Sequence, residues 1–116
     1  MVKMMNHNRL QLLPKAEKAI KKLTKKDAAL KQRLIEALRQ ILTDPAEAGE
    51  AKTGDLAGIY GYDIYHRGIN YEIAYLIDQD DSGHVVVVVV LVGTRENFYE
   101  ELKRYMKTNQ APFSKP

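Results

Sequence analysis

Eight consecutive apolar residues, VVVVVVLV, occupy positions 85–92 and constrain the fold more than any other part of the sequence. The run is far shorter than the roughly 20 apolar residues that a membrane-spanning helix needs. Its β-branched valines favour an extended strand. Because no polar residue alternates with the valines, both faces of that strand have to be covered, as at the centre of a sheet. We therefore predict a central strand from His84 to Val92, ended by Gly93.

Two further strands are predicted immediately before the central one. Residues 69–77 alternate, and one face carries Ile69, Tyr71, Ile73, Tyr75 and Ile77. We expect this face to pack against helices and the other face to stay open. The open face carries Asn70, Glu72, Ala74 and Leu76. Residues 59–66 form the preceding strand, and Arg67 and Gly68 make the tight turn between the two.

The N-terminal third predicts a short edge strand followed by a helical hairpin. Residues 9–13 form the candidate strand, and Pro14 is suited to the first turn of a helix. Apolar residues then recur at helical spacing on either side of a polar break at 24–27, at Ala16, Ile20, Leu23, Leu30, Leu34, Ala37, Leu38 and Ile41. Asp27 can cap the second helix. That helix should end near Asp44, because the following proline disfavours helix in the residue before it.

The remaining segments complete an α+β fold. Residues 46–61 contain glycines and small residues and are interpreted as a flexible connector. Glu96–Met106 is predicted to be a C-terminal helix with one apolar stripe, formed by Phe98, Leu102 and Tyr105. The helical hairpin should pack on a small, largely antiparallel sheet of three or four strands. The 116 residues fit a single domain over 1–116, with an ordered core of about 9–107 and a flexible tail at 108–116.

Charge is divided unevenly along the chain, whose net charge is +3. Residues 14–40 contain nine basic and three acidic residues, a balance of +6, whereas residues 44–81 contain two basic and nine acidic residues, a balance of −7. A nucleic-acid site would be expected on the basic part; solvated helix surfaces also carry such lysines. The chain has no cysteine, and its N-terminus does not resemble a signal peptide, so we expect a cytoplasmic protein without a membrane segment.

The sequence contains few groups that suggest chemistry. It has no phosphate-binding glycine loop and no histidine pair at metal-ligand spacing, so we predict no cofactor and no metal site. Arg95 and Tyr99 are four residues apart at the start of the last predicted helix and should share a face. There Arg95 could hold a phosphate, and Tyr99 could stack on a base or transfer a proton. Alternatively, Arg95 pairs with Glu100 or Asp63, and Tyr99 only packs.

Three segments give the chain a family resemblance: LPKAEKAIKKL, YDIYHRGINYEIAYLI and VVVVVVLVGTRENFYEELKRY. Over residues 9–107 the pattern resembles the RelE/ParE superfamily of toxins from bacterial toxin–antitoxin modules. The resemblance to the RelE branch implies a ribosome-dependent endonuclease that cuts mRNA in the 30S decoding site. In that branch the 2′-hydroxyl attacks the adjacent phosphate, and a cognate antitoxin blocks the toxin. It also implies either a monomer or a toxin–antitoxin hetero-oligomer.

The resemblance assigns roles to individual residues. Arg95 would stabilise the transition state, Tyr99 would position a base, and Glu72 would be the candidate general base, as a glutamate is in the similar YoeB branch. RNA contacts are expected at Lys18, Lys22, Lys25, Lys52 and Arg67. RelE enzymes, however, carry lysines at the positions matching Gly61 and Asp63 and an arginine at that of Glu72. These departures leave an alternative, a ParE-like gyrase inhibitor or an inactive homologue that only binds protein.

Overall fold

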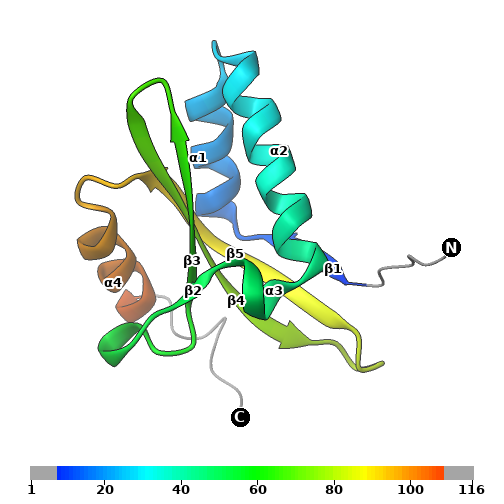
Figure 1. Cartoon of the computed structure of the whole chain (residues 1–116). Coiled ribbons are helices and arrows are strands. Elements are labelled where there is room, and N and C mark those ends of the chain that lie inside the picture. Colours follow the sequence, from blue (N-terminus) through cyan, green and yellow to red (C-terminus); the bar gives the residue numbers. More distant parts are fainter. Residues whose placement is uncertain (1–7, 109–116) are drawn as a thin grey trace, which may run out of the picture.

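The computed structural model describes residues 8–108, which form one sheet with helices on both faces (Figure 1). In chain order the elements are β1 (Arg9–Leu12), α1 (Pro14–Thr24), α2 (Ala28–Thr43), α3 (Pro45–Ala48), β2 (Glu50–Ala51), the 3₁₀ turn η1 (Gly54–Leu56), β3 (Tyr60–His66), β4 (Ile69–Gln79), β5 (Val85–Thr94) and α4 (Phe98–Thr108). The predicted tail lies outside the described residues except for Thr108, which ends α4.

The sheet has five strands in the order β1-β5-β4-β3-β2. β5 lies between β4, which is antiparallel to it, and β1, which is parallel to it. Its residues 87–92 are all buried, which confirms the predicted central strand. The strand continues through Gly93 to Thr94, so Gly93 does not end it. The edge strand near residue 9 is also confirmed.

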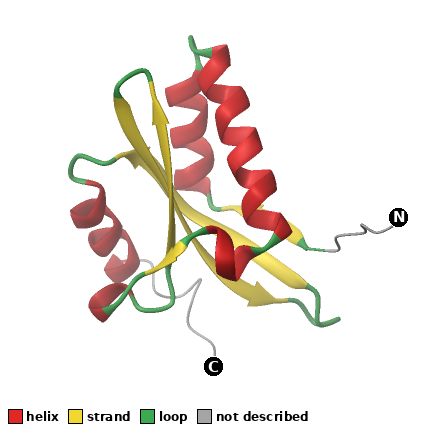
Figure 2. Ribbon diagram, viewed as in Figure 1, coloured by secondary structure: helices red, strands yellow, loops and turns green. Residues whose placement is uncertain are grey.

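The helical hairpin covers one face of the sheet (Figure 2). Its apolar stripe packs on Tyr71, Ile73 and Tyr75, which are at most 6% exposed, and this confirms the predicted inner face of β4. Ile69 was expected on the same buried face, but it is the first residue of β4 after the β3–β4 turn and is 43% exposed. Asp27 caps α2 as predicted, because its Oδ1 accepts a hydrogen bond from the N–H of Leu30 at 3.0 Å.

Part of the second face of the sheet is covered as well, which corrects the expectation of an open face. α4 packs there through Phe98 and Leu102, both nearly fully buried, against Ala74 and the outward residues of β5. The segment 46–61 is not a plain connector, since it forms α3, β2 and η1 and adds a fifth strand to the sheet. None of the helices between residues 8 and 108 has the length and apolar composition needed to cross a membrane.

Candidate functional site

The junction between β5 and α4 positions Arg95. The structure places this residue in the turn before α4, which starts at Phe98 rather than at Glu96. Arg95 was predicted at the N-terminal end of the helix, and it precedes the helix instead. Its backbone N–H donates to the carbonyl of Asn70 at 2.9 Å, which ties the turn to β4. Asn97 has a φ of 62° and completes the reversal into the helix. The Arg95 guanidinium still reaches Tyr99, with Nη2 3.5 Å from the hydroxyl oxygen.

Glu72 is the buried centre of the site. It was expected on an open sheet face, but the cover provided by α4 and by the segment containing β2 leaves it only 1% exposed. The Tyr99 hydroxyl donates to this carboxylate and lies 2.8 Å from Oε1 and 3.1 Å from Oε2. A buried carboxylate is costly unless charges or hydrogen bonds compensate it. Tyr99 on α4 therefore supplies part of the compensation for a charge on β4.

Lys52 supplies the closest positive charge. Its Nζ donates to the Tyr99 hydroxyl oxygen at 2.7 Å and lies 3.0 Å from Glu72 Oε2, with its side chain only 16% exposed. Burial of the ammonium lowers the pKa of Lys52, but the hydrogen bonds and charges of Tyr99 and Glu72 outweigh this effect and raise the pKa above its ordinary value. Lys52 was predicted as an RNA contact, and the structure places it in the Glu72 cluster.

Gly61 makes room for this arrangement. A Cβ built on Gly61 would overlap Glu72 Oε2 and would lie 2.8 Å from Lys52 Cε. The pairing of Glu50 with Gly61 between β2 and β3 brings the chain of Lys52 to this position. Sequence reasoning did not find this contact, because a strand of two residues has no periodicity. A glycine within an otherwise bulky strand was the one available signal of a close approach.

Arg95 and Asp63 form the exposed rim of the site. Arg95 Nη1 lies 3.4 Å from Asp63 Oδ2, and Arg95 Nε lies 3.8 Å from Glu72 Oε1. The Arg95 side chain is 47% exposed and that of Asp63 is 56% exposed. The charges of Tyr99, Asp63 and Glu72, in that order of size, raise the pKa of Arg95 further. Glu100 and Asp63 were considered as alternative partners of Arg95, and the structure shows the contact with Asp63.

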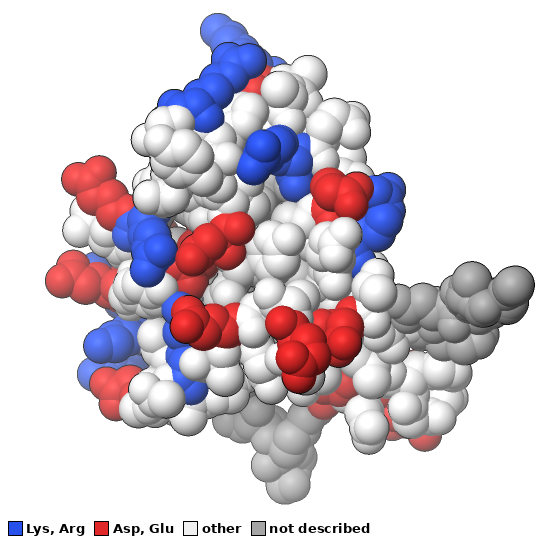
Figure 3. All heavy atoms as spheres, viewed as in Figure 1, with Lys and Arg blue, Asp and Glu red and all other residues white. Residues whose placement is uncertain are grey.

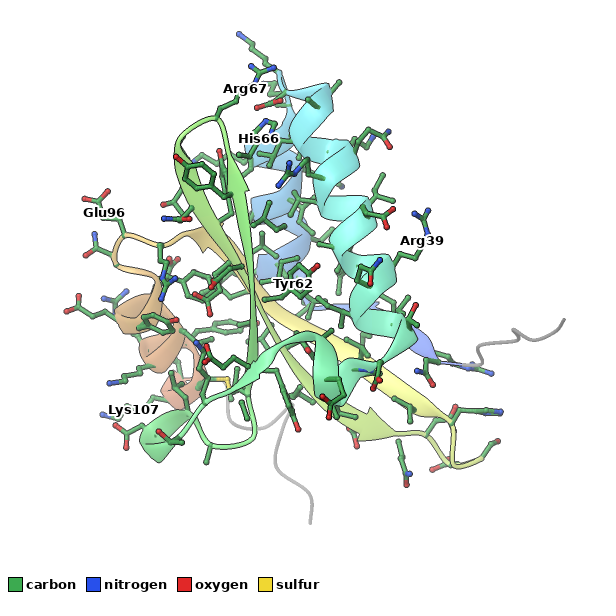
Figure 4. All side chains as sticks on the ribbon, viewed as in Figure 1. Arg39, Tyr62, His66, Arg67, Glu96 and Lys107 are labelled. Atoms are coloured by element: carbon green, nitrogen blue, oxygen red, sulfur yellow. The ribbon has the colours of Figure 1, made fainter. Side chains whose placement is uncertain are left out.

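The other predicted RNA contacts lie away from this cluster. Lys18 and Lys22 are exposed on α1, and Lys25 is in the turn that follows; the hairpin covers the opposite face of the sheet. Figure 4 shows Arg67 at the tip of the β3–β4 turn, close to the turn between α1 and α2. In the view of Figure 3, basic side chains gather at this end, whereas acidic side chains spread over the middle and lower surface. Of the predicted site residues, the structure thus brings together Arg95, Tyr99, Glu72 and Lys52.

The arrangement combines a buried acid, a phenol between that acid and an ammonium, and an accessible guanidinium. Such a set can transfer a proton through the phenol and can hold an anion at the rim. Within residues 8–108 no group of three or more histidine, aspartate or glutamate side chains is placed to hold a metal ion.

Comparisons with known proteins agree on the fold. The YoeB/ParE toxin from Agrobacterium tumefaciens has a TM-score of 0.62 at 17% identity, covering 75% of this chain and 98% of that chain. The RelBE2 toxin–antitoxin complex from Mycobacterium tuberculosis has a TM-score of 0.56 at 22% identity, covering 75% of this chain and 96% of that chain. The YoeB dimer from Staphylococcus aureus has a TM-score of 0.58 at 20% identity, covering 75% of this chain and 95% of that chain.

Sequence comparison identifies the family. A search of curated proteins gave no match. The family model described as the ParE-like toxin of type II bacterial toxin–antitoxin systems matches residues 10–103, which is most of the chain and includes the whole cluster around Glu72. The chain therefore belongs to the ParE-like toxin family of type II bacterial toxin–antitoxin systems.

Proposed function

We propose that this toxin is a RelE-like, ribosome-dependent mRNA endonuclease of the cytoplasm, neutralised by a cognate antitoxin. The observation that supports it most is the convergence of Arg95, Tyr99, Glu72 and Lys52 from separate segments of the chain. A surface that only binds protein has no need for a buried carboxylate joined to a phenol and two cations. Clusters of buried, strongly interacting ionisable groups are more typical of sites that perform chemistry.

Glu72 is proposed to act through Tyr99. At 1% exposure the carboxylate cannot touch a ribose, whereas the Tyr99 residue is half-buried and its hydroxyl lies between the carboxylate and the Arg95 guanidinium at the exposed rim. When the 2′-hydroxyl attacks the adjacent phosphorus, its proton passes to the Tyr99 oxygen as the Tyr99 proton moves to Glu72. The bond from phosphorus to the 5′-oxygen breaks, and that oxygen takes a proton from water. Lys52, 2.7 Å from the Tyr99 oxygen, stabilises negative charge on the phenol during the transfer.

Arg95 is proposed to bind the phosphate. Its side chain is 47% exposed and lies beside the Tyr99 hydroxyl, where the reacting phosphate would lie. The contact to Asp63 at 3.4 Å joins two exposed groups, and such ion pairs contribute little, so a phosphate can replace it. A planar guanidinium can then make a two-pronged contact with the equatorial oxygens as their charge increases.

The test compares Arg95→Ala with Arg104→Ala, which removes the same charge from the exposed surface of α4. Cleavage of a defined message on programmed ribosomes is followed by primer extension with the purified toxin. Loss of one transition-state donor should lower the cleavage rate about 10²- to 10³-fold, and Tyr99→Phe should also lose cleavage. Because the Arg95 side chain is 47% exposed but lies 3.8 Å from Glu72 Oε1, its removal should lower the free energy of unfolding by no more than about 1 kcal/mol. Full cleavage by Arg95→Ala would remove it from the proposed mechanism.

A second candidate function is a toxin that binds a protein such as gyrase without cleaving RNA. The contacts of Glu72 favour this candidate, because Tyr99 and Lys52 already bind both carboxylate oxygens. The balance of two cations against the carboxylates of Glu72 and Asp63 also leaves the site with little net attraction for RNA. Intact messages in arrested cells, together with lost DNA supercoiling, would support this candidate instead.

A further inference from the structure

Tyr65 is an exposed aromatic residue outside the cluster described above. It is 62% exposed, more than Ile69 at 43% or Ile35 at 39%. Along β3, Ile64 and His66 point towards the helical hairpin and are buried, so Tyr65 points to the same side as Gly61 and Asp63. Its ring is therefore presented to solvent on the face of the sheet that carries Arg95.

The backbone around Tyr65 is held on both sides. Its carbonyl accepts a hydrogen bond from Arg33 Nη2 at 2.7 Å, and its cross-strand partner in β4 is Asn70. The turn between them has only two residues, Arg67 with a φ of 52° and Gly68 with a φ of 78°, which is the tight geometry of a short hairpin. The backbone that carries the ring is therefore held in one conformation.

Asn70 connects this ring to the rim of the site. Its side chain is exposed, and its carbonyl accepts the backbone N–H of Arg95 at 2.9 Å. Tyr65 is two residues from Asp63 on β3, about 7 Å along the strand, and Asp63 contacts the Arg95 guanidinium. An aromatic ring, an exposed amide and a guanidinium thus lie on one face of the sheet, with the Tyr65 ring extending towards the turn at Gly68 and the guanidinium towards Asp63.

Tyr99 is poorly placed to stack on a base itself. Lys52 Nζ lies 4.6 Å from the centre of the Tyr99 ring, and the Phe98 ring contacts it edge-on at 5.7 Å between centroids. The ring is half-buried, and its hydroxyl is engaged by Glu72. A ring exposed to solvent is better suited to stack on a base than Tyr99 is.

We propose that Tyr65 and Asn70 form a nucleobase subsite for single-stranded RNA next to Arg95. The base of a nucleotide along the strand from the bound phosphate stacks on the Tyr65 ring, and the Asn70 amide offers a donor and an acceptor to the edge of that base. This subsite rests on the proposed RNA-directed function, but it makes a separate demand, because stacking depends on the ring and not on the chemistry at Tyr99.

The test measures binding of the full-length protein to a fluorescein-labelled, 2′-O-methylated oligoribonucleotide by anisotropy at low salt. The methylated RNA cannot react, so binding is read independently of cleavage. Tyr65→Ala should weaken binding about 5- to 100-fold, the usual range for loss of one stacked base. Tyr65→Phe should bind like wild type, and so should Ile35→Ala, which removes an exposed apolar side chain from α2. Asn70→Ala should reduce the differences in affinity among homopolymers of the four bases.

The salt dependence separates stacking from phosphate contacts. Tyr65→Ala should keep the wild-type slope of affinity against salt, whereas Arg95→Ala should reduce the slope by about one unit. Wild-type binding by Tyr65→Ala, equal weakening by Ile35→Ala, or no RNA binding by wild type at low salt would each overturn the subsite. Weaker antitoxin binding by Tyr65→Ala with unchanged RNA affinity would identify a protein interface instead. If the toxin binds RNA through Tyr65 but does not cleave it on ribosomes, the subsite stands and the endonuclease proposal fails.

Discussion

Replacing Lys52 with methionine tests the energetics of the buried cluster directly. The change keeps the length of the side chain and removes its charge, which lies 3.0 Å from a carboxylate that is 1% exposed. Glu72 Oε2 would then retain only the Tyr99 hydroxyl at 3.1 Å, and Arg95 would remain at 3.8 Å from Oε1. Breaking a fully buried ion pair by removing one partner costs about 3–5 kcal/mol. Because Lys52 is partly exposed and Arg95 remains, we expect a loss of about 2–3 kcal/mol.

The loss should appear as a melting temperature lowered by roughly 8–12 °C for a domain of this size. Urea unfolding followed by circular dichroism measures the free energies of Lys52→Met, Glu72→Gln and the double variant. If the charges are coupled, the double variant should lose less than the sum of the single losses. Lys18→Met, on the exposed surface of α1, is the matched control and should change stability by no more than about 0.5 kcal/mol.

The pH dependence of this effect has a definite sign. The pKa of Lys52 is raised above its ordinary value of 10.5 in the folded protein, so its stabilising contribution is complete below pH 10.5. It disappears as the pH rises through the folded pKa, where wild type and Lys52→Met should converge in stability. A Lys52→Met protein that is as stable as wild type at pH 7, or strictly additive losses in the double variant, would refute this account of the cluster.

Two further predictions concern the packing around the sheet. Gly61→Ala should lower the free energy of unfolding, measured by chemical denaturation, by about 1–3 kcal/mol, because the new methyl group overlaps Glu72 Oε2. Gly93→Ala is the control and should be nearly neutral, because its Cβ would lie 3.5 Å from Phe98. Burial raises the pKa of Tyr75 to about 12, so its contribution is complete below pH 10.0 and lost as the pH rises towards 12. Stability should therefore fall more steeply over this range in wild type than in Tyr75→Phe, and parallel losses in urea titrations at each pH would contradict the assignment.

The sequence predicted those parts of the fold that depend on regular patterns. The valine run identified β5 as central because its residues have no polar face, and the spacing of Leu30, Leu34 and Ile41 identified the buried stripe of α2. The i, i+4 spacing of Arg95 and Tyr99 also predicted their contact, even though Arg95 precedes the helix. In each case a local repeat determined the structure.

The missing parts depend on contacts between distant segments. Alternation placed Glu72 on the second face of β4, but it does not specify that α4 covers this face, so the carboxylate was expected in solvent. Lys52 reaches Glu72 through the two-residue strand β2, which is too short for any pattern. A charge cluster built from three segments can be recognised only when their relative positions are known.

The parallel pairing of β1 with β5 has a consequence for the timing of folding. The first described strand forms its hydrogen bonds with the last strand, since Arg9 pairs with Val86 and Leu12 with Val89. During synthesis, the apolar stripes of α1 and α2 therefore wait for β5 before the sheet can close beneath them. Contacts between residues so distant in the sequence slow folding, because a large loop has to close first. A chain interrupted before β5 also lacks Arg95 and Tyr99, so assembly of the core and completion of the Glu72 cluster both wait until β5 and α4 have been synthesised.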